Sequence, residues 1–268
     1  MTRPRPLPTM HRFGHNRSPV DVATRDERKR QADAVIRELA ALGDAATARG
    51  QGRFFKEDIR SLGVAAPAIR RLEKQMFTGV AKRWSADEAL EFCELVLAER
   101  LLEPTLLALI FLGRFGDRLE PEAFDRAQRW LERELCDNWA TVDTLCPLVL
   151  SPIVRRHPRL AARLKRWTVA PNRWLRRASA VALIKLAPDP AFHPAIFDVA
   201  ARLLRDKEDD LVQKANGWLL RDVGRADRRR LEAFLLAHGA DVPRTTLRYA
   251  LEKFPAGQRN RLMTATRG

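Results

Sequence analysis

Residues 137–154 read DNWATVDTLCPLVLSPIV, and this stretch decides the fold because two related segments follow it in the chain. The second, PNRWLRRASAVALIKLA, spans residues 171–187, and the third, DDLVQKANGWLLRDVG, spans residues 209–224. Each is an amphipathic segment that follows a turn, and the segments recur at intervals of about 40 residues. Paired-helix repeats of the HEAT type have periods in this range and stack into a solenoid with a concave face. The three segments therefore predict a HEAT-like helical-repeat solenoid.

The rest of the chain also has a helical pattern. Ala, Leu, Arg and Glu are abundant and form helices well, and apolar residues recur at spacings of three and four. Ser85 with Glu88 three residues later predicts a capping box. Gly and Pro divide this all-α pattern into segments of normal helix length, at about 24–42, 54–62, 67–77, 85–98, 103–114, 121–135, 139–156, 158–167, 173–186, 192–205, 208–223, 227–237 and 243–253.

We expect one ordered domain over residues 24–268, preceded by a tail. With 268 residues, of which 46% are hydrophobic, the chain can bury a substantial core. Residues 1–23 are basic and rich in Pro and Arg, which predicts a disordered segment. The start lacks the apolar core of a signal peptide, and no apolar run reaches the ~18 residues of a membrane helix. We therefore expect a cytoplasmic protein that has no contact with membranes.

The cysteines and histidines argue against disulfide and metal sites. The three cysteines are odd in number and form no CxxC pair, which fits a reducing compartment. We expect Cys93, Cys136 and Cys146 to be small buried hydrophobic residues. The five histidines show no metal-ligand pattern, and no P-loop, GxGxxG, HExxH or calcium loop occurs. We therefore expect neither a metal nor another cofactor.

The chain is strongly basic, with a formal net charge of +15 and a pI near 10.8. Such a charge favours a polyanionic partner, and nucleic acid is the first candidate. The alternative is a compositional bias toward arginine, which would leave a solvated basic face without a partner. On a solenoid, basic residues gathered on the concave face would suit a DNA duplex.

In the first repeated segment, a tryptophan and a carboxylate stand at the edge of an apolar stripe. At 100° per residue, Trp139 and Asp143 lie about 60° and 100° from Val142 on a helix. Both can pack against neighbours and still present one edge to a cleft. The alternatives are core packing for Trp139, and a helix-start carboxylate or a structural ion pair for Asp143. The central stripe of this helix consists of Val142, Leu145, Val149 and Ile153.

In the second segment, Trp174 and Arg177 lie one helical turn apart and share a face that continues toward the core. Arg177 is therefore expected to point inward rather than Arg176, and Trp174 is expected to be core. A buried arginine needs an anion, which could be Asp143, a phosphate or both. A purely structural ion pair is the alternative.

The third segment places a tryptophan directly after a glycine. Gly217 weakens a helix but permits close backbone approach, and Trp218 follows it. Taken alone, Trp218 would be read as a core residue. Lys214 and Arg221 lie near the face of Trp218, where they could meet phosphates or be solvated.

Three motifs, taken in order, resemble a known family. They are NWATVD at residues 138–143, NRWLRRASA at 172–180 after a His-Pro turn, and QKANGWLLRD at 213–222. Together they resemble the DNA alkylation repair glycosylases of the AlkD type, most clearly between residues 138 and 254. FFKEDIRSLGVAAPAIRRL, at residues 54–72, is similar to the first repeat of that family in a less specific way. Where that family carries a polar residue before the first-repeat proline, this chain has Ala65 and Ala66.

The resemblance implies a fold and an activity. The family has HEAT-like repeats around a concave, positively charged DNA-binding cleft, and it removes cationic alkylated purines, chiefly 3-alkyladenine and 7-alkylguanine, without a metal. It implies that Asp143 is the catalytic carboxylate and that Trp139, Trp218 and Arg177 are the cleft residues. It also implies that the lesion need not be flipped out of the duplex. The expected partner is double-stranded DNA containing alkylated bases, bound by a monomer that is nucleoid-associated when on DNA.

This chemistry suits a single carboxylate. A cationic alkylated purine is already a good leaving group, and loss of the base leaves an oxocarbenium-like sugar. Asp143 could stabilise that cation and position the attacking water. The motifs contain no candidate Schiff-base lysine, so we expect a monofunctional glycosylase. The alternatives are a non-catalytic HEAT-like protein that binds damaged or branched DNA, and a scaffold for protein partners, which would require an apolar concave face.

Overall fold

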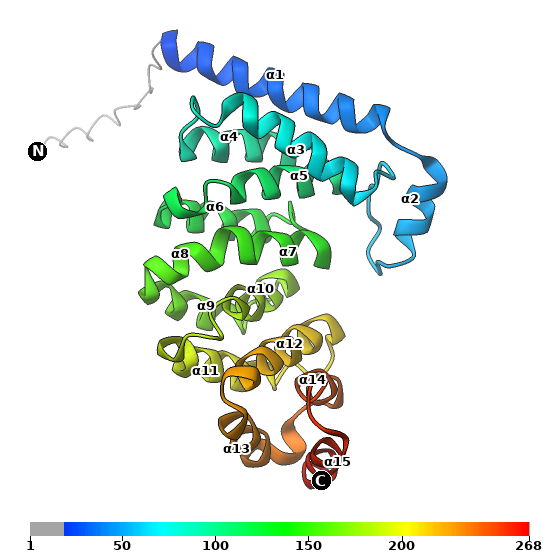
Figure 1. Ribbon diagram of the computed structural model, residues 1–268, viewed down its shortest axis with the longest axis vertical. Helices are drawn as coiled ribbons and strands as arrows, with labels where there is room; N and C mark the ends of the chain where they lie inside the picture. Colours follow the sequence, from blue (N-terminus) through cyan, green and yellow to red (C-terminus); the bar gives the residue numbers. More distant parts are fainter. Residues whose placement is uncertain (1–18, 268) are drawn as a thin grey trace, which may run out of the picture.

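The structure is a computed structural model that describes residues 19–267, with side chains from residue 25. Among these residues there is no strand, and the helices stack from α1 at one end to α15 at the other (Figure 1). The predicted all-α, helical-repeat fold is confirmed. No helix in the described part is long and apolar enough to cross a bilayer. The helices are α1 (Pro19–Ala41), α2 (Ala45–Gly52), α3 (Ala66–Val80), α4 (Ala86–Leu97), α5 (Leu102–Gly113), α6 (Pro121–Glu132), α7 (Trp139–Leu145), α8 (Ser151–Arg156), α9 (Ala161–Trp167), α10 (Arg173–Ile184), α11 (His193–Leu203), α12 (Asp210–Ala226), α13 (Arg228–His238), α14 (Arg244–Ala250) and α15 (Ala256–Ala265).

The stack has two rows of helices. In one row, which we call the cleft row, α5, α7, α10, α12 and α14 pack on one another in succession. Helices of the second row lie behind it, so that α9 packs on α10 and α11 on α12. The cleft-row helices begin at residues 102, 139, 173, 210 and 244, at intervals of 34 to 37 residues. The repeat is therefore present and slightly shorter than the sequence indicated.

The predicted helix 139–156 is continuous but changes its hydrogen-bond register. A π-helical segment, Cys146–Leu150, separates α7 from α8, and the Ser151 N–H bonds to the Cys146 carbonyl. Pro147 explains the change, because it lacks the N–H that an α-helix would donate to the carbonyl of Asp143. The predicted stripe of Val142, Leu145, Val149 and Ile153 is fully buried.

The expected helix at 54–62 is wrong. These residues are irregular, and a short helix, α2, precedes them instead. The cause is a tertiary interaction: the buried Glu103 carboxylate accepts hydrogen bonds from the N–H groups of residues 62–64 and from the Ser61 hydroxyl. Gly63, with φ of 77°, completes the turn, and a Cβ there would lie 2.0 Å from the Asp44 carbonyl oxygen. A buried acceptor thus overrides the helical pattern of this segment.

Both ends of the chain also differ from the expected boundaries. Helix α1 begins at Pro19, before the predicted start near residue 24, while residues 1–18 of the predicted tail lie outside the described residues. Helix α15 was not predicted; it begins after Pro255 and buries only Leu262 among its residues, which gave too weak a pattern.

The three cysteines are buried and free, as predicted, and Ser85 and Glu88 form the predicted capping box.

Helices α12 and α14 touch closely at one glycine. A Cβ on Gly217 would lie 2.5 Å from the Tyr249 Cβ and 2.6 Å from the Thr246 carbonyl oxygen. The Thr246 hydroxyl also donates to the Gln213 carbonyl at 3.1 Å. Gly217 therefore sets the spacing of the last two helices of the cleft row, as the close approach inferred from the sequence requires.

We expect Gly217→Ala to lower the free energy of unfolding by about 1–3 kcal/mol, because the added methyl forces α12 and α14 apart. Urea unfolding followed by circular dichroism measures the change. Gly79→Ala in α3 is the matched control, because a Cβ there meets nothing within 4 Å; it should not lower stability. Equal losses in the two variants would contradict the close-contact explanation.

Candidate active site

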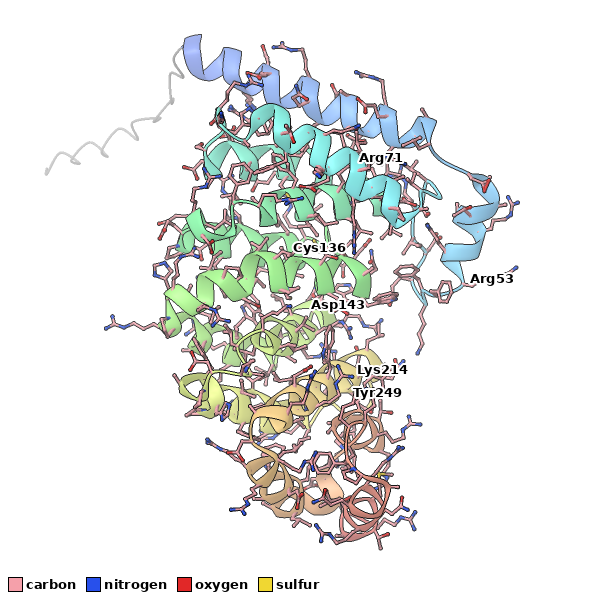
Figure 2. The ribbon with its side chains drawn as sticks, in the orientation of Figure 1. Arg53, Arg71, Cys136, Asp143, Lys214 and Tyr249 are labelled. Carbon is pink, nitrogen blue, oxygen red and sulfur yellow. The ribbon has the colours of Figure 1, made fainter. Side chains whose placement is uncertain are left out.

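A cleft of about 420 Å³ opens on the cleft row, between α7, α10 and α12 and the segment that follows α2. Figure 2 shows Asp143, Lys214 and Tyr249 one after another along the edge of the stack nearest that segment. The remaining lining includes Phe54, Lys56, Glu57 and Leu211. The lining contains all six residues singled out in the sequence: Trp139, Asp143, Arg177, Lys214, Trp218 and Arg221.

The centre of the cleft is an ion pair between Asp143 and Arg177. Arg177 Nε donates to Asp143 Oδ1 at 3.0 Å, and a terminal nitrogen donates to Oδ2 at 2.8 Å. The other terminal nitrogen donates to the Leu211 carbonyl. One guanidinium therefore joins α7, α10 and the first turn of α12.

The two charges differ in their access to solvent. The Arg177 side chain is only 6% exposed, whereas the Asp143 side chain is 18% exposed and keeps an edge on the cleft. Arg177 rather than Arg176 points inward, as predicted, while Arg176 pairs with Asp206. The pair supplies a carboxylate whose position is fixed at both oxygens.

The three central helices start with the same kind of cap, and this aligns their charged residues. The side chains of Asn138, Asn172 and Asp209 accept hydrogen bonds from the first free N–H groups of α7, α10 and α12. A capping side chain fixes where a helix begins, and residues four apart then share a face. The residues one and five positions after the caps are Trp139 and Asp143, Arg173 and Arg177, and Asp210 and Lys214.

Trp139 is partly covered by a segment that sequence reasoning missed. We call residues 53–57 the crossing segment. The Phe55 ring stacks on the Trp139 indole, with centroids 5.2 Å apart and 16° between the planes. Trp139 Nε1 donates to the Phe54 carbonyl at 3.3 Å, while the Phe54 side chain is 76% exposed. These contacts were hidden because a helix was expected here. By contrast Trp174 is buried, which confirms its predicted place in the core.

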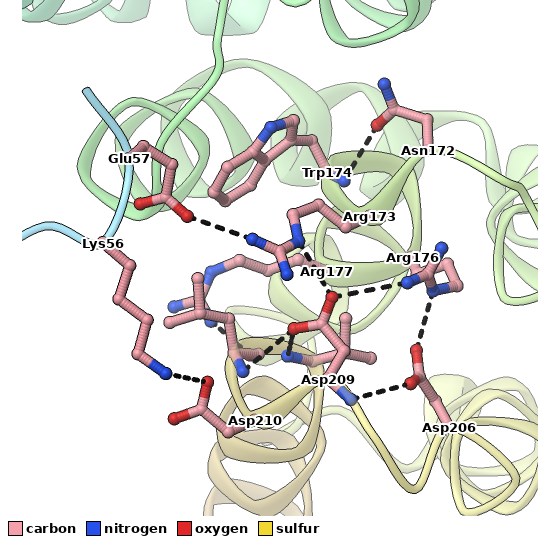
Figure 3. Close-up of polar contacts among 12 residues, drawn as sticks. Lys56, Glu57, Asn172, Arg173, Trp174, Arg176, Arg177, Asp206, Asp209 and Asp210 are labelled. Atoms are coloured by element: carbon pink, nitrogen blue, oxygen red, sulfur yellow. Dashed lines mark hydrogen bonds and ion pairs between the residues drawn. The ribbon is translucent and has the colours of Figure 1, made fainter. Parts of the chain in front are cut away.

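The crossing segment is also tied to the cleft row by charges, as Figure 3 shows. Lys56 Nζ lies 3.0 Å from an Asp210 oxygen, and Glu57 lies 3.1 Å from an Arg173 nitrogen. Arg173 also bonds to Asp209, the cap of α12, at 2.9 Å. Arg173 and Asp210 directly follow the capping residues of their helices, as Trp139 does. This shared position in the sequence could have pointed to both residues.

The cleft lining is more balanced in charge than its expected basic character suggests. It has four cations, Lys56, Arg177, Lys214 and Arg221, and two carboxylates, Glu57 and Asp143. Each of the four cations also has a carboxylate partner, since Arg221 pairs with Glu252. The free protein thus pairs all four cleft cations internally, with Asp210 shared by Lys56 and Lys214.

A buried thiol, that of Cys146, is affected by the charges of the ion pair. Burial raises the pKa of Cys146, and the neighbouring charge of Asp143 raises it further. The thiol is therefore neutral, and thiolate is the nucleophilic form. Within the described residues, no group of His, Cys, Asp or Glu side chains could hold a metal ion.

Fold and cleft together define a helical-repeat protein whose cleft holds a partly exposed carboxylate paired with a buried arginine. A family model described as DNA alkylation repair enzyme matches residues 35–254, and the chain belongs to this family. No curated protein sequence matches the chain. A solved structure from Enterococcus faecalis, described as a predicted DNA alkylation repair enzyme, shares the fold with a TM-score of 0.68. It is 17% identical, and the match covers 80% of this chain and 97% of that one.

We expect Arg177→Ala to lower the free energy of unfolding by about 3 kcal/mol, because it leaves Asp143 without its partner and separates three helices. Thermal and urea unfolding measure the loss. The control is Arg261→Ala, which removes an arginine from a pair with Glu232 whose cation is 65% exposed; it should cost less than about 1 kcal/mol. Similar losses would mean that the Arg177 ion pair does not join the repeats.

Proposed function

We propose that this protein is a monofunctional DNA glycosylase that hydrolyses the N-glycosidic bond of positively charged alkylated purines in duplex DNA. The substrates are 3-alkyladenine and 7-alkylguanine. The observation that carries the proposal is the Asp143 carboxylate, held by Arg177 in a cleft that Trp139 and Trp218 also line. Membership of the DNA alkylation repair enzyme family supports DNA as the substrate.

The reaction needs little help with the leaving group. As the bond from C1′ to the purine nitrogen breaks, its electron pair passes to the cationic base, which leaves as a neutral molecule. The sugar is left as an oxocarbenium-like cation, and Asp143 stabilises it electrostatically. A water molecule then adds to C1′ and loses its proton. No amine of the protein joins the sugar, so the strand is not cut.

Arg177 has a second role in this scheme. Its hydrogen bonds fix both oxygens of Asp143, so the carboxylate is already oriented before DNA arrives. Preorganised charge of this kind needs no rearrangement as the cation develops. We also assign the two remaining N–H groups of this guanidinium to the phosphate beside the lesion.

The aromatic residues supply surfaces for the damaged nucleotide. Trp139 and Trp218 offer ring faces to the deoxyribose and to the cationic base, an interaction that strengthens as water is excluded. We propose that the lesion stays stacked in the duplex, so its deoxyribose rather than its base approaches Asp143. Lesions with bulky alkyl groups would then fit, because no base pocket has to enclose them.

Wild-type protein should release 7-methylguanine from duplex DNA, and Asp143→Asn should release it at least about 100-fold more slowly, because the variant lacks the negative charge. Base release is measured by chromatography under single-turnover conditions. Binding of the same duplex is the control and should change little. Loss of release together with an equal loss of binding would indicate a structural role for Asp143.

Duplex binding should weaken steeply with salt. If each of the four cleft cations neutralises one phosphate, the logarithm of affinity falls with the logarithm of salt with a slope near −3.6, about −0.9 per phosphate. Fluorescence anisotropy across a salt series measures the slope. A nearly flat dependence between low and physiological salt would rule out phosphate contacts in the cleft.

The competing function is non-catalytic binding of damaged or branched DNA. It is favoured by the occupation of both Asp143 oxygens in an ion pair, which is also what a structural carboxylate shows. Duplexes containing 3-methyladenine distinguish the two functions, because this lesion is the other expected substrate. Tight, salt-sensitive binding without release of either base would favour the non-catalytic function.

A further inference from the structure

A carboxylate of the protein lies between two lysines on the wall of the cleft. Lys56 Nζ is 3.0 Å from Asp210 Oδ1, and Lys214 Nζ is 3.0 Å from Asp210 Oδ2. Each oxygen thus meets one ammonium group, and both lysines line the cleft that holds Asp143. The lysines come from distant parts of the chain, one from the crossing segment and one from the second turn of α12. Figure 3 shows Lys56 extended toward Asp210.

This bridge is not needed to begin α12. Asp209 is the N-cap, and its side chain already accepts hydrogen bonds from two free N–H groups of the first turn. Asp210 adds the modest stabilisation that any carboxylate gains near a helix N-terminus. The same position of α10 holds Arg173, so the repeat does not require an acid there. The contacts of Asp210 with the two lysines therefore explain the presence of this carboxylate better than a role at the start of α12 does.

The bridge is charged and accessible. The Lys56 side chain is 70% exposed, and Lys214 and Asp210 are partly exposed. Partial burial acts to raise the pKa of Asp210, but the hydrogen bonds from Lys214 and Lys56 outweigh it and hold this pKa below its usual value. At neutral pH the carboxylate is thus an anion that compensates two lysines in reach of a ligand.

We propose that Asp210 occupies, in the DNA-free protein, the place of a DNA phosphate between Lys56 and Lys214. A phosphodiester has two non-bridging oxygens that share one negative charge, so it can receive the same two ammonium groups. The inference rests on the proposed function, because it requires duplex DNA in this cleft. The contact is autoinhibitory: a phosphate of the duplex competes with this carboxylate for the two lysines.

Displacement of Asp210 also affects the aromatic part of the cleft. Lys56 belongs to the crossing segment, whose Phe55 ring and Phe54 carbonyl contact Trp139. A phosphate that takes Lys56 from Asp210 removes one of the ties that hold this segment to α12. Phosphate binding is thereby coupled to the surroundings of Trp139.

The test compares binding of an undamaged duplex by wild type and Asp210→Asn, using fluorescence anisotropy at low salt. Asparagine keeps the shape but removes the charge, and affinity should rise about 3- to 10-fold. Asp198→Asn is the matched control. Asp198 also bridges two cations, Lys165 and Arg202, but it lines a different cavity from the cleft. The Asp198→Asn variant measures the effect of raising the net charge by one away from the cleft. Its affinity for the duplex should differ from that of wild type by less than about 2-fold.

A second arm repeats the comparison in a Lys56→Gln, Lys214→Gln background, where Asp210→Asn should no longer raise affinity because the two lysines carry the effect. The inference is overturned if Asp210→Asn raises the affinity for the duplex no more than Asp198→Asn does. It is also overturned if Asp210→Asn still raises the affinity in the background that lacks both lysines. Circular dichroism melting of each variant checks that all are folded. If the wild-type protein binds no duplex, both the proposed function and this inference are wrong. If the wild type binds the duplex but Asp210→Asn does not bind it more tightly, this inference alone is wrong.

Discussion

The ion pair between Asp143 and Arg177 is the interaction on which the rest of the cleft depends. An arginine that is almost completely buried must satisfy its donors, and here it does so with a carboxylate of α7 and a carbonyl of α12. Removing charges from water is costly, so the pair is a weak source of stability compared with apolar packing. Its effect is geometric: it fixes the relative positions of three successive repeats. The cleft opens where these three helices meet.

In this repeat architecture, the position of the cap of each helix determines which of its residues belong to the site. Each of the three central helices begins at a side-chain cap, and the cap determines which residues face the cleft. The positions one and five residues after the cap are then equivalent in the three helices. In α7 they hold Trp139 and Asp143, and in α12 they hold Asp210 and Lys214. Substitutions at these two positions change the charges at the cleft, and at Arg177 they also act on the contact between the repeats.

The sequence predicts the parts of this structure that follow from local periodicity. The buried stripe around Val142, the inward position of Arg177 and the core position of Trp174 all follow from helical spacing, and all are observed. The segment at 54–62 could not be predicted in this way, because Glu103, some 40 residues away, binds the backbone at its C-terminal end and the segment is irregular. The partner of Lys56 was hidden for the same reason. Lys56 and Asp210 are separated by 154 residues, and no local pattern records their contact.

Net charge is therefore a poor measure of what the cleft offers to DNA. The chain carries +15, yet each cation of the cleft lining has a carboxylate partner in the free protein. If duplex DNA binds as proposed, each phosphate contact exchanges one anion for another, and the gain is smaller than the number of cations suggests. A cationic base would differ from a normal base in this setting, because it would add a positive charge near Asp143, which stays paired with Arg177. The internal ion pairs would then weaken binding to undamaged DNA more than binding to DNA that contains a cationic base. The protein would thereby distinguish the lesion from undamaged DNA, although both are polyanions.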